Sequence, residues 1–374
     1  MSALPKSIAN LKGANLLKKT IILIIATLCM LAILVGCGDQ QGPSGTDGRT
    51  TGGVVNVRNW GYFIDRAVLD LFYQEYGIRV NYTEFASNEE LYALLRMGGA
   101  DIDVAIPSDY MIGRMIEEDM LYELDFANIP NYILIDPRFR NLAFDPDNRF
   151  SVAYKVGTVG LIYNYALIGE EITSWGALFD PRFAGQILMF DNPRDAFGVA
   201  LKYLGYSINT TNEDEIHRAF ELLVQQRGIL QAYVMDQIFD KLEGGEAWLG
   251  PYYSPDFLTM RGNNPNLRLA HPVEGTNFFV DAMIIPRGAQ NRENAEKFIN
   301  FMARTDIALM NMRWSYYASA NYEAARIFSE ELPPEDRHVV FATDEVYART
   351  EVFLHLPQHI LELYDQLWIE LRAG

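Results

Sequence analysis

The sequence predicts an α/β protein whose folded part is divided into two lobes. Strand-like and helix-like hydrophobic patterns alternate along the chain, which is typical of sheets flanked by helices. From residue 54 onward roughly 320 residues remain, more than one hydrophobic core usually supports. Hydrophobic residues make up 49% and charged residues 21% of the 374-residue chain, so we expect a packed core rather than disorder.

The first elements alternate between strand and helix. Residues 54–58 alternate like a strand, and a second strand is expected over 78–82. Between them a helical stripe ends at Gly77 and is formed by Val68, Leu71, Phe72 and Tyr76. A capping box at 87–90 then opens a helix that ends near Gly98, and a strand follows over 103–107.

Similar units recur further along the chain. Asn192 and Pro193 open a helix that Gly205 ends, and residues 213–226 carry another helical stripe. We therefore expect several mostly parallel strands in each lobe. There is no internal repeat of fixed period.

The charge balance excludes one broad class of partner. The chain carries 31 Lys+Arg against 49 Asp+Glu, a net charge of −18. Four of the lysines lie in residues 1–36, which hold no acid, so the remainder has a net charge of −22. Binding to nucleic acid depends on cationic contacts to phosphate, so we expect no nucleic-acid partner.

A removable leader is predicted over residues 1–36. Lys18 and Lys19 precede an apolar run over 20–35, which is too short for a comfortable membrane span of about 20 residues. A plain secretory signal and a helical anchor are the alternatives.

The run ends in Leu34-Val35-Gly36-Cys37, the pattern of a bacterial lipoprotein signal. Cys37 would then be diacylated and become the first residue. Cys29 would be removed with the leader, which leaves one cysteine and no disulfide. Residues 37–53 are rich in Gly, Ser, Thr and Gln, so they are predicted to form a flexible tether.

Common enzyme signatures do not support catalysis. The sequence has no G-x-S-x-G, G-x-x-x-x-G-K-[ST], G-x-G-x-x-G or H-E-x-x-H motif. His355 and His359 stand four residues apart, but Pro357 between them favours a helix start over a shared metal, so no metal is predicted. Paired carboxylates for glycoside hydrolysis would need a spacing that selects one pair, and none does.

Aromatic residues gather beside strand ends, next to hydroxyls and acids. In an open α/β sheet, ligands bind beyond the carboxyl ends of strands, where Trp60, Ser108 and Tyr110 are expected. The aromatic groups are Asn59-Trp60-Gly61-Tyr62-Phe63, Pro107-Ser108-Asp109-Tyr110, Gly250-Pro251-Tyr252-Tyr253, Phe278-Phe279-Val280-Asp281 and Trp314-Ser315-Tyr316-Tyr317.

Several of these motifs together resemble one family. The landmarks are Asn59-Trp60, Gly77-Ile78-Arg79-Val80, Ser87-Asn88-Glu89, Asp103 to Tyr110, Phe144 to Asn148, Ser174-Trp175, Leu204 to Ser207, Asn209 to Thr211 and Phe279 to Asp281. From about residue 54 to the C-terminus, the sequence resembles the spermidine/putrescine-binding proteins of polyamine ABC importers, a branch of the periplasmic binding protein superfamily.

The resemblance implies a two-lobed fold in which each lobe has a central β-sheet flanked by helices. A polycation would be held in a cleft between the lobes. The chain would cross between them near Gly157, Asp281 and Ala325. The first lobe would then hold 54–156 and 281–325, and the second 157–280 and 326–374.

The resemblance also implies which rings sandwich the amines of the ligand. An ammonium over a ring face gains about 0.5–2 kcal/mol as it is desolvated. The alternative is that these rings belong to the core. They are Trp60, Phe63, Tyr110, Tyr253, Phe279 and Tyr317.

At the acid positions of the family, the sequence departs from the pattern. Asp281 matches and Asp195 replaces a glutamate, whereas Tyr62 and Asn192 stand where spermidine binders carry acids. Asn192 and Asp195 alternatively cap a helix. Because two acids match, the resemblance favours a two-charge ligand such as putrescine over spermidine. Two further acids are possible replacements, Asp236 and Glu351.

The sequence is thus interpreted as an extracytoplasmic, lipid-anchored protein without cofactor or metal. It would capture a polyamine, deliver it to an ABC permease, and attach to the bacterial membrane through Cys37. The rivals are the same fold with another cationic or sugar-like solute, and a lipoprotein hydrolase that uses Asp195 and Asp281.

Overall fold

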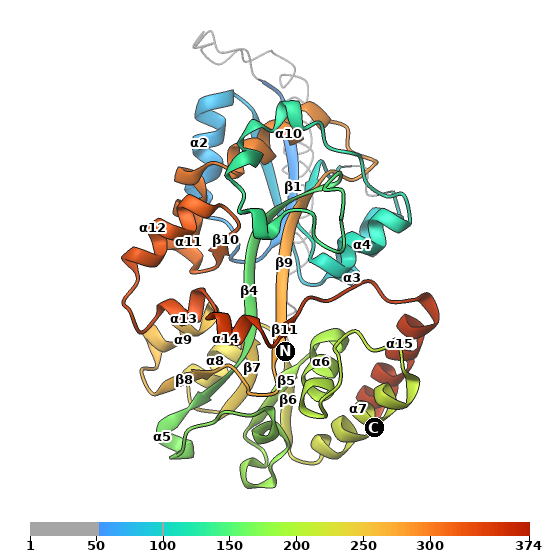
Figure 1. The fold of residues 1–374 in the computed structure, drawn as a ribbon, viewed down its shortest axis with the longest axis vertical. Coiled ribbons are helices and arrows are strands. Elements are labelled where there is room, and N and C mark those ends of the chain that lie inside the picture. The colour runs from blue at the N-terminus through green and yellow to red at the C-terminus, as the bar shows by residue number, and fades with distance from the viewer. Residues whose placement is uncertain (1–51, 99–100) are drawn as a thin grey trace, which may run out of the picture. The chain divides into compact units, whose positions relative to one another are not determined.

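Two long strands run through the whole of the described fold, and every other sheet element is arranged around them. The computed structural model describes residues 52–98 and 101–374. The two strands, β4 (Ser151–Asn164) and β9 (Thr276–Ile284), are antiparallel and buried along their full length. Figure 1 shows them side by side between an upper and a lower group of elements.

The upper half is a sheet covered by helices. Its strands follow the order β2-β1-β3-β9-β4, with β10 on β4. The short strands are β1 (Val54–Trp60), β2 (Arg79–Phe85), β3 (Val104–Ala105) and β10 (Ala318–Ser319). The helices are α2 (Arg66–Tyr76), α3 (Asn88–Arg96), α4 (Asp109–Glu117), α10 (Arg292–Met302), α11 (Thr305–Ser315) and α12 (Tyr322–Glu331).

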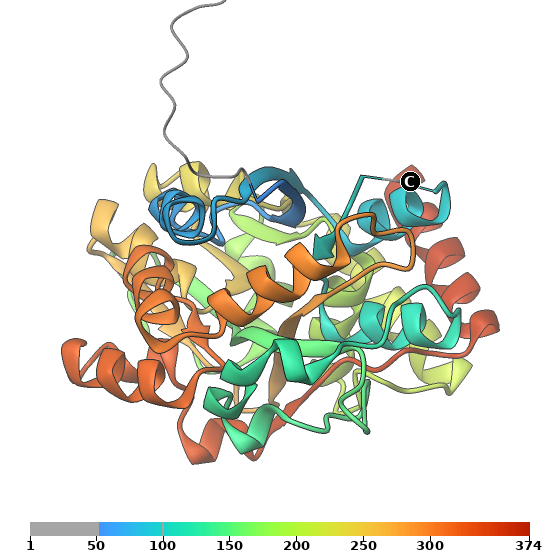
Figure 2. The same cartoon turned by 90° about the horizontal axis from the view of Figure 1, so that it is seen from above.

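The lower half repeats the plan. Its strands continue from β4 in the order β7-β5-β6, with β8 on β4 and β11 on β9. They are β5 (Ile187–Phe190), β6 (Leu230–Val234), β7 (Leu249–Tyr253), β8 (Leu267–Ala270) and β11 (Thr350–Glu351). Its helices are α5 (Tyr165–Ile168), α6 (Pro193–Tyr203), α7 (Glu213–Arg227), α8 (Ile238–Glu243), α9 (Asp256–Asn263), α13 (Arg337–Val340), α14 (Asp344–Tyr347) and α15 (Gln358–Ala373). Seen from above, helices surround the strands (Figure 2).

The predicted start and stop signals are confirmed at several helices. Gly77 ends α2 in the left-handed conformation (φ 67°), and Ser87 caps α3 by accepting a hydrogen bond from the Glu90 amide at 3.1 Å. Asn192 caps α6, and α15 begins directly after Pro357. Local sequence therefore determines these helix ends.

The expectation of mostly parallel strands is correct for only part of the sheet, because β8 and β10 also run antiparallel to β4. β1 is parallel to β2 and β3, and β5 is parallel to β6 and β7. The central strands β4 and β9 run antiparallel to each other. β4 is also antiparallel to β7, and β9 is antiparallel to β3. Periodicity identifies a strand but not the direction of its partner, which explains the difference.

The chain passes from one half to the other within β4 and β9. β4 pairs with β9 over residues 151–158 and then with β7 from Val159 onward. Ala325 lies inside α12, and residues 332–336 link that helix to α13. In this link Asp336 forms an ion pair of 2.6 Å with Arg261 of α9.

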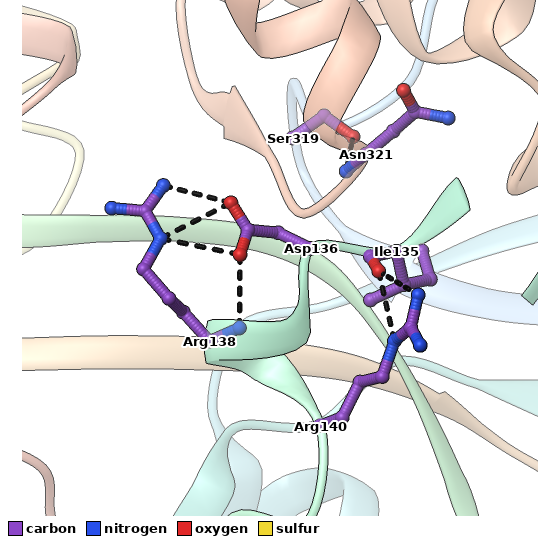
Figure 3. Close-up of polar contacts among 6 residues, drawn as sticks. All are labelled: Ile135, Asp136, Arg138, Arg140, Ser319 and Asn321. Carbon is purple, nitrogen blue, oxygen red and sulfur yellow. Dashed lines mark hydrogen bonds and ion pairs between the residues drawn. The ribbon is translucent and has the colours of Figure 1, made fainter. Parts of the chain in front are cut away.

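The long connection between α4 and β4 is hydrogen-bonded to the residues that directly follow β10. Ile135 forms an isolated bridge with Asn321, and the Asp136 amide donates to the Ala320 carbonyl at 2.8 Å. Figure 3 shows Arg138 paired with Asp136 and Arg140 donating to the Ile135 carbonyl. These contacts fix β10, which pairs with β4 next to the residues described below.

At the N-terminal edge, Gly52 and Gly53 already belong to the fold. The Gly52 amide donates to the Gly77 carbonyl at 2.9 Å, and the Gly53 carbonyl accepts from Arg79 at 3.0 Å. These two residues, which the predicted tether of 37–53 includes, are therefore bonded to the first sheet elements. The leader, Cys29 and Cys37 lie outside the described residues.

Candidate functional site

Four of the predicted rings form one continuous row across the two halves. Phe63 lies 4.8 Å from Tyr317, Tyr317 lies 6.1 Å from Phe279, and Phe279 lies 5.5 Å from Tyr253, measured between ring centres. Phe63 and Tyr317 come from the upper half, Phe279 from β9, and Tyr253 from the end of β7. We call this row the aromatic track.

The track depends on a glycine opposite Phe279. Gly157 of β4 pairs with Phe279, and a Cβ atom at residue 157 would lie 2.5 Å from the Phe279 Cζ atom. A side chain there would therefore displace the ring.

Three aspartates accompany the track, and each accepts a hydrogen bond from a hydroxyl group. Ser108 donates to Asp281 at 2.7 Å, Tyr253 donates to Asp195 at 3.2 Å, and Tyr317 donates to Asp256 at 2.7 Å. We call Asp195, Asp256 and Asp281 the track aspartates. The Tyr317–Asp256 bond joins the halves, because Tyr317 precedes β10 and Asp256 begins α9.

Burial makes these carboxylates hard to ionise. Asp195 is 8% and Asp281 4% exposed, whereas Asp256 is half-buried. Burial raises the pKa of Asp195, Asp256 and Asp281 to about 7, while the hydroxyl donors oppose the shift. Among the residues that the structure describes, none of the three forms an ion pair with lysine, arginine or histidine. Such a group of acids is suited to stabilise a cationic ligand that enters between them.

Asp281 is held in place by the pairing of three strand segments. It pairs with Lys155 of β4 and forms an isolated bridge with Ser108. The register of β4 shifts between Ala153 and Lys155, so Tyr154 is an extra residue there. Such bulges change the direction in which the next side chain points.

Lys155 is buried beside the track, although lysine is rarely found inside proteins. It is 1% exposed, and its Nζ atom donates to the Ser315 hydroxyl at 2.6 Å. The Nζ atom lies 4.4 Å from the centre of the Phe63 ring and 5.3 Å from that of Tyr317. Burial lowers the pKa of Lys155 to about 7, against the opposing effect of Asp256 and Asp281.

The structure separates the roles of Asn192 and Asp195. Asn192 accepts from the amides of Arg194 at 3.0 Å and of Asp195 at 3.4 Å, so it acts as the helix cap. The Asp195 side chain turns away from capping and accepts from Tyr253 instead. The capping alternative therefore describes Asn192 but not Asp195.

Tyr110 lies on the upper side of the site. Its hydroxyl donates to Glu89 at 2.9 Å and accepts from Asn88 at 3.1 Å. Its ring lies 5.4 Å from the guanidinium of Arg194, which belongs to α6 of the lower half. Burial and the nearby Glu89 raise the pKa of the Tyr110 hydroxyl well above its usual value.

Two predicted residues pack on aromatic rings that are not part of the track. Trp60 packs on Phe85, with ring centres 4.4 Å apart, and its buried indole nitrogen has no partner among the described protein atoms. Tyr62 is 79% exposed and stacks on Trp314 at 6.1 Å.

The two possible replacement acids are bonded to groups outside the track, although the charge of Asp236 acts on Asp256. Asp236 is exposed and accepts from the Tyr252 hydroxyl at 2.8 Å. Glu351 forms an ion pair of 2.7 Å with Lys202 and also accepts from Ser207.

Sequence reasoning missed two charged residues of the site, Asp256 and Lys155. Asp256 follows the aromatic strand end at Tyr253, but an acid at the first position of a helix is common for capping reasons alone. Lys155 is the one charged residue of β4, whose residues are otherwise suited to burial. That contrast was a usable signal, because a charge in a buried strand needs a partner.

Other site types find no support among residues 52–98 and 101–374. No group of three or more His, Cys, Asp or Glu side chains there is arranged to hold a metal ion. His355 lies before α15 and faces Glu117 at 3.4 Å, whereas His359 lies within the helix. None of the helices in this part of the chain is long and apolar enough to span a membrane.

Comparison with known proteins places this geometry in a family. Residues 100–337 match the family described as bacterial extracellular solute-binding protein. The spermidine/putrescine-binding periplasmic protein of Salmonella typhimurium is 34% identical over 277 residues, which cover 73% of this chain and 79% of that protein.

Two solved structures share the fold over nearly their full length. A putative spermidine/putrescine ABC transporter protein from Listeria monocytogenes is 35% identical, with a TM-score of 0.80 over 85% of this chain and 98% of that chain. The substrate-binding protein of a spermidine/putrescine ABC transporter from Streptococcus pneumoniae is 32% identical, with a TM-score of 0.74 over 86% of this chain and 99% of that chain. The upper and lower halves are therefore the two lobes of a periplasmic-binding-protein fold. The chain belongs to the bacterial extracellular solute-binding proteins, in the branch that includes the spermidine/putrescine-binding proteins.

Proposed function

We propose that this protein captures a linear polyamine, with a diamine such as putrescine favoured, and delivers it to an ABC importer. The observation that carries the proposal is the aromatic track with its three aspartates, which have hydroxyl donors but no ion-pair partner among the described residues. Ammonium groups satisfy buried carboxylates, and the ring faces cover both the ammonium groups and the methylenes between them. The names of the similar proteins support the same ligand class.

The proposed ligand contacts are the predicted residues that lie on or beside the aromatic track. Asp281, Asp195, Ser108 and the four track rings are proposed to contact the ligand, together with Asp256. Tyr110 closes the site from the upper lobe. Trp60, Tyr62 and Asn192 remain predicted contacts, while Asp236 and Glu351 are proposed to stay outside.

The lobe boundaries and the membrane attachment are part of the same proposal. The first lobe holds about residues 54–156 and 281–331 and the second 157–280 and 337–374, with residues 332–336 as the third link. Cys37 carries the lipid that keeps the protein at the outer face of the cell membrane. A binding role without catalysis agrees with the family of solute-binding proteins.

A thermal-shift screen tests the proposal. Putrescine, cadaverine and spermidine are added to the protein at micromolar to millimolar concentrations, with 1,4-butanediol as the uncharged control. A ligand that binds only the folded state raises the melting temperature by mass action, by an amount that grows with concentration. Polyamines that shift the melting temperature no more than butanediol does would contradict the proposal, and turnover of a substrate would favour the hydrolase.

A further inference from the structure

The ammonium group of Lys155 occupies the kind of place that the proposed function assigns to a ligand amine. Its Nζ atom lies over Phe63 at 4.4 Å and near Tyr317 at 5.3 Å, and both are rings of the aromatic track. The side chain is 1% exposed and bonded to Ser315 at 2.6 Å, so it is fixed at this end. A ligand ammonium cannot use the same ring faces while Lys155 is there.

Lys155 also changes the charge that a ligand must match. The register of β4 and β9 places it beside Asp281, and its charge interacts with both Asp281 and Asp256. The three track aspartates supply three negative charges when ionised, and Lys155 supplies one positive charge. Among these four side chains, protonated Lys155 leaves two negative charges, so a ligand with two positive charges balances them and a third would be in excess.

The order of charged groups along the track indicates which positions remain for the ammonium groups of a ligand. Lys155 and Asp256 lie at the Phe63–Tyr317 end, Asp281 lies on the same strand as the central ring Phe279, and Asp195 lies at the Tyr253 end. The open positions for ammonium groups are thus those at Asp281 and Asp195. A longer triamine would direct its third ammonium at Lys155.

We propose that Lys155 is a built-in cation that fills one ammonium position of the site and thereby limits the ligand to two charges. Lys155 is then a specificity-determining residue that selects diamines over triamines. This inference rests on the proposed function, because it specifies which polyamine that site accepts. The physical reason is that two like charges forced together in a desolvated site repel strongly.

Calorimetric titration with putrescine and spermidine tests the inference. The proteins are the wild type, Lys155→Met, Lys155→Arg and, as a control, Lys241→Met, whose partly exposed side chain pairs with Glu246. Each is checked for folding by circular dichroism. We expect the wild type and both Lys155→Arg and Lys241→Met to prefer putrescine. In Lys155→Met the ratio of spermidine to putrescine affinity should rise by about tenfold or more, because one position and one charge are released.

The outcomes separate the inference from the proposed function. A folded Lys155→Met protein with the wild-type ratio would overturn the inference and leave polyamine binding intact. If Lys155→Met does not fold, the wild type still decides, since tighter binding of spermidine than of putrescine by the wild type would overturn the inference. If the wild type binds neither polyamine, the proposed function itself fails and the inference falls with it.

Discussion

The hydroxyl of Tyr317 donates a hydrogen bond of 2.7 Å to Asp256, from one lobe of the protein to the other. Arg194 makes a second contact between the lobes, over the ring of Tyr110 at 5.4 Å. These contacts close the site over the track aspartates. Above pH 7 the ionised track aspartates outnumber the single cation Lys155, so they repel one another when no ligand is bound and closure is linked to the ligand.

We therefore expect saturating putrescine to reduce the radius of gyration of the protein at pH 8, measured by small-angle X-ray scattering. Contacts to both lobes hold the closed form when the ligand is bound. Tyr317→Phe, which lacks the bond to Asp256, should show a smaller ligand-dependent change. An identical radius with and without putrescine in the wild type would count against closure.

Putrescine affinity should fall as the pH is lowered from 8 to 6. The track aspartates have a pKa of about 7 in the unliganded protein, and the ligand needs their ionised form. The lowered pKa of Lys155 acts in the same direction, because its protonation makes the site less negative. Titration calorimetry at pH 6.5 in phosphate and in Tris should give different binding enthalpies, which reports proton release. Equal enthalpies and a flat pH profile would show that the aspartates are already ionised.

Asp195→Asn should stabilise the ligand-free protein, and more at pH 8 than at pH 5. Burial raises the pKa of Asp195 from 3.8 to about 7, so its contribution to stability is fully present below pH 3.8 and is lost as the pH rises through 7. The amide removes that loss, which amounts to at most about 4 kcal/mol at pH 8. Chemical denaturation at both pH values measures it, with the exposed Asp240→Asn as control. A gain that is equal at the two pH values would point to a cause other than ionisation.

Cys37→Ser should release the protein from the membrane fraction of cells that express the full chain. A diacyl anchor supplies two hydrophobic chains, and stable attachment needs two such signals. Cys29→Ser is the matched control and should stay membrane-bound, because Cys29 lies within the apolar run that is predicted to be cleaved. Retention of Cys37→Ser in the pellet after a high-salt wash would rule out the lipid anchor at this residue.

The family resemblance of the sequence predicted the rings of the site. It named Phe63, Tyr253, Phe279 and Tyr317, and the structure places these four in one row. Asp256 and Lys155 were missed for different physical reasons. Asp256 joins the track through its hydrogen bond from Tyr317 of the other lobe. Lys155 lies beside the track because β4 and β9 pair antiparallel with a register shift. Neither long-range arrangement is encoded in local periodicity.

Titration of putrescine into the wild type and Asp281→Asn, with Asp240→Asn as control, shows whether the track aspartates hold the ligand. Asp281 is 4% exposed, and its bond from Ser108 can be kept by the amide oxygen, so the change removes charge rather than structure. We predict one putrescine per chain in the wild type and a loss of about 2–5 kcal/mol of binding free energy in Asp281→Asn, because a buried ammonium would lose its counter-charge. Near-wild-type affinity in Asp281→Asn would contradict the claim that the track aspartates bind the ligand.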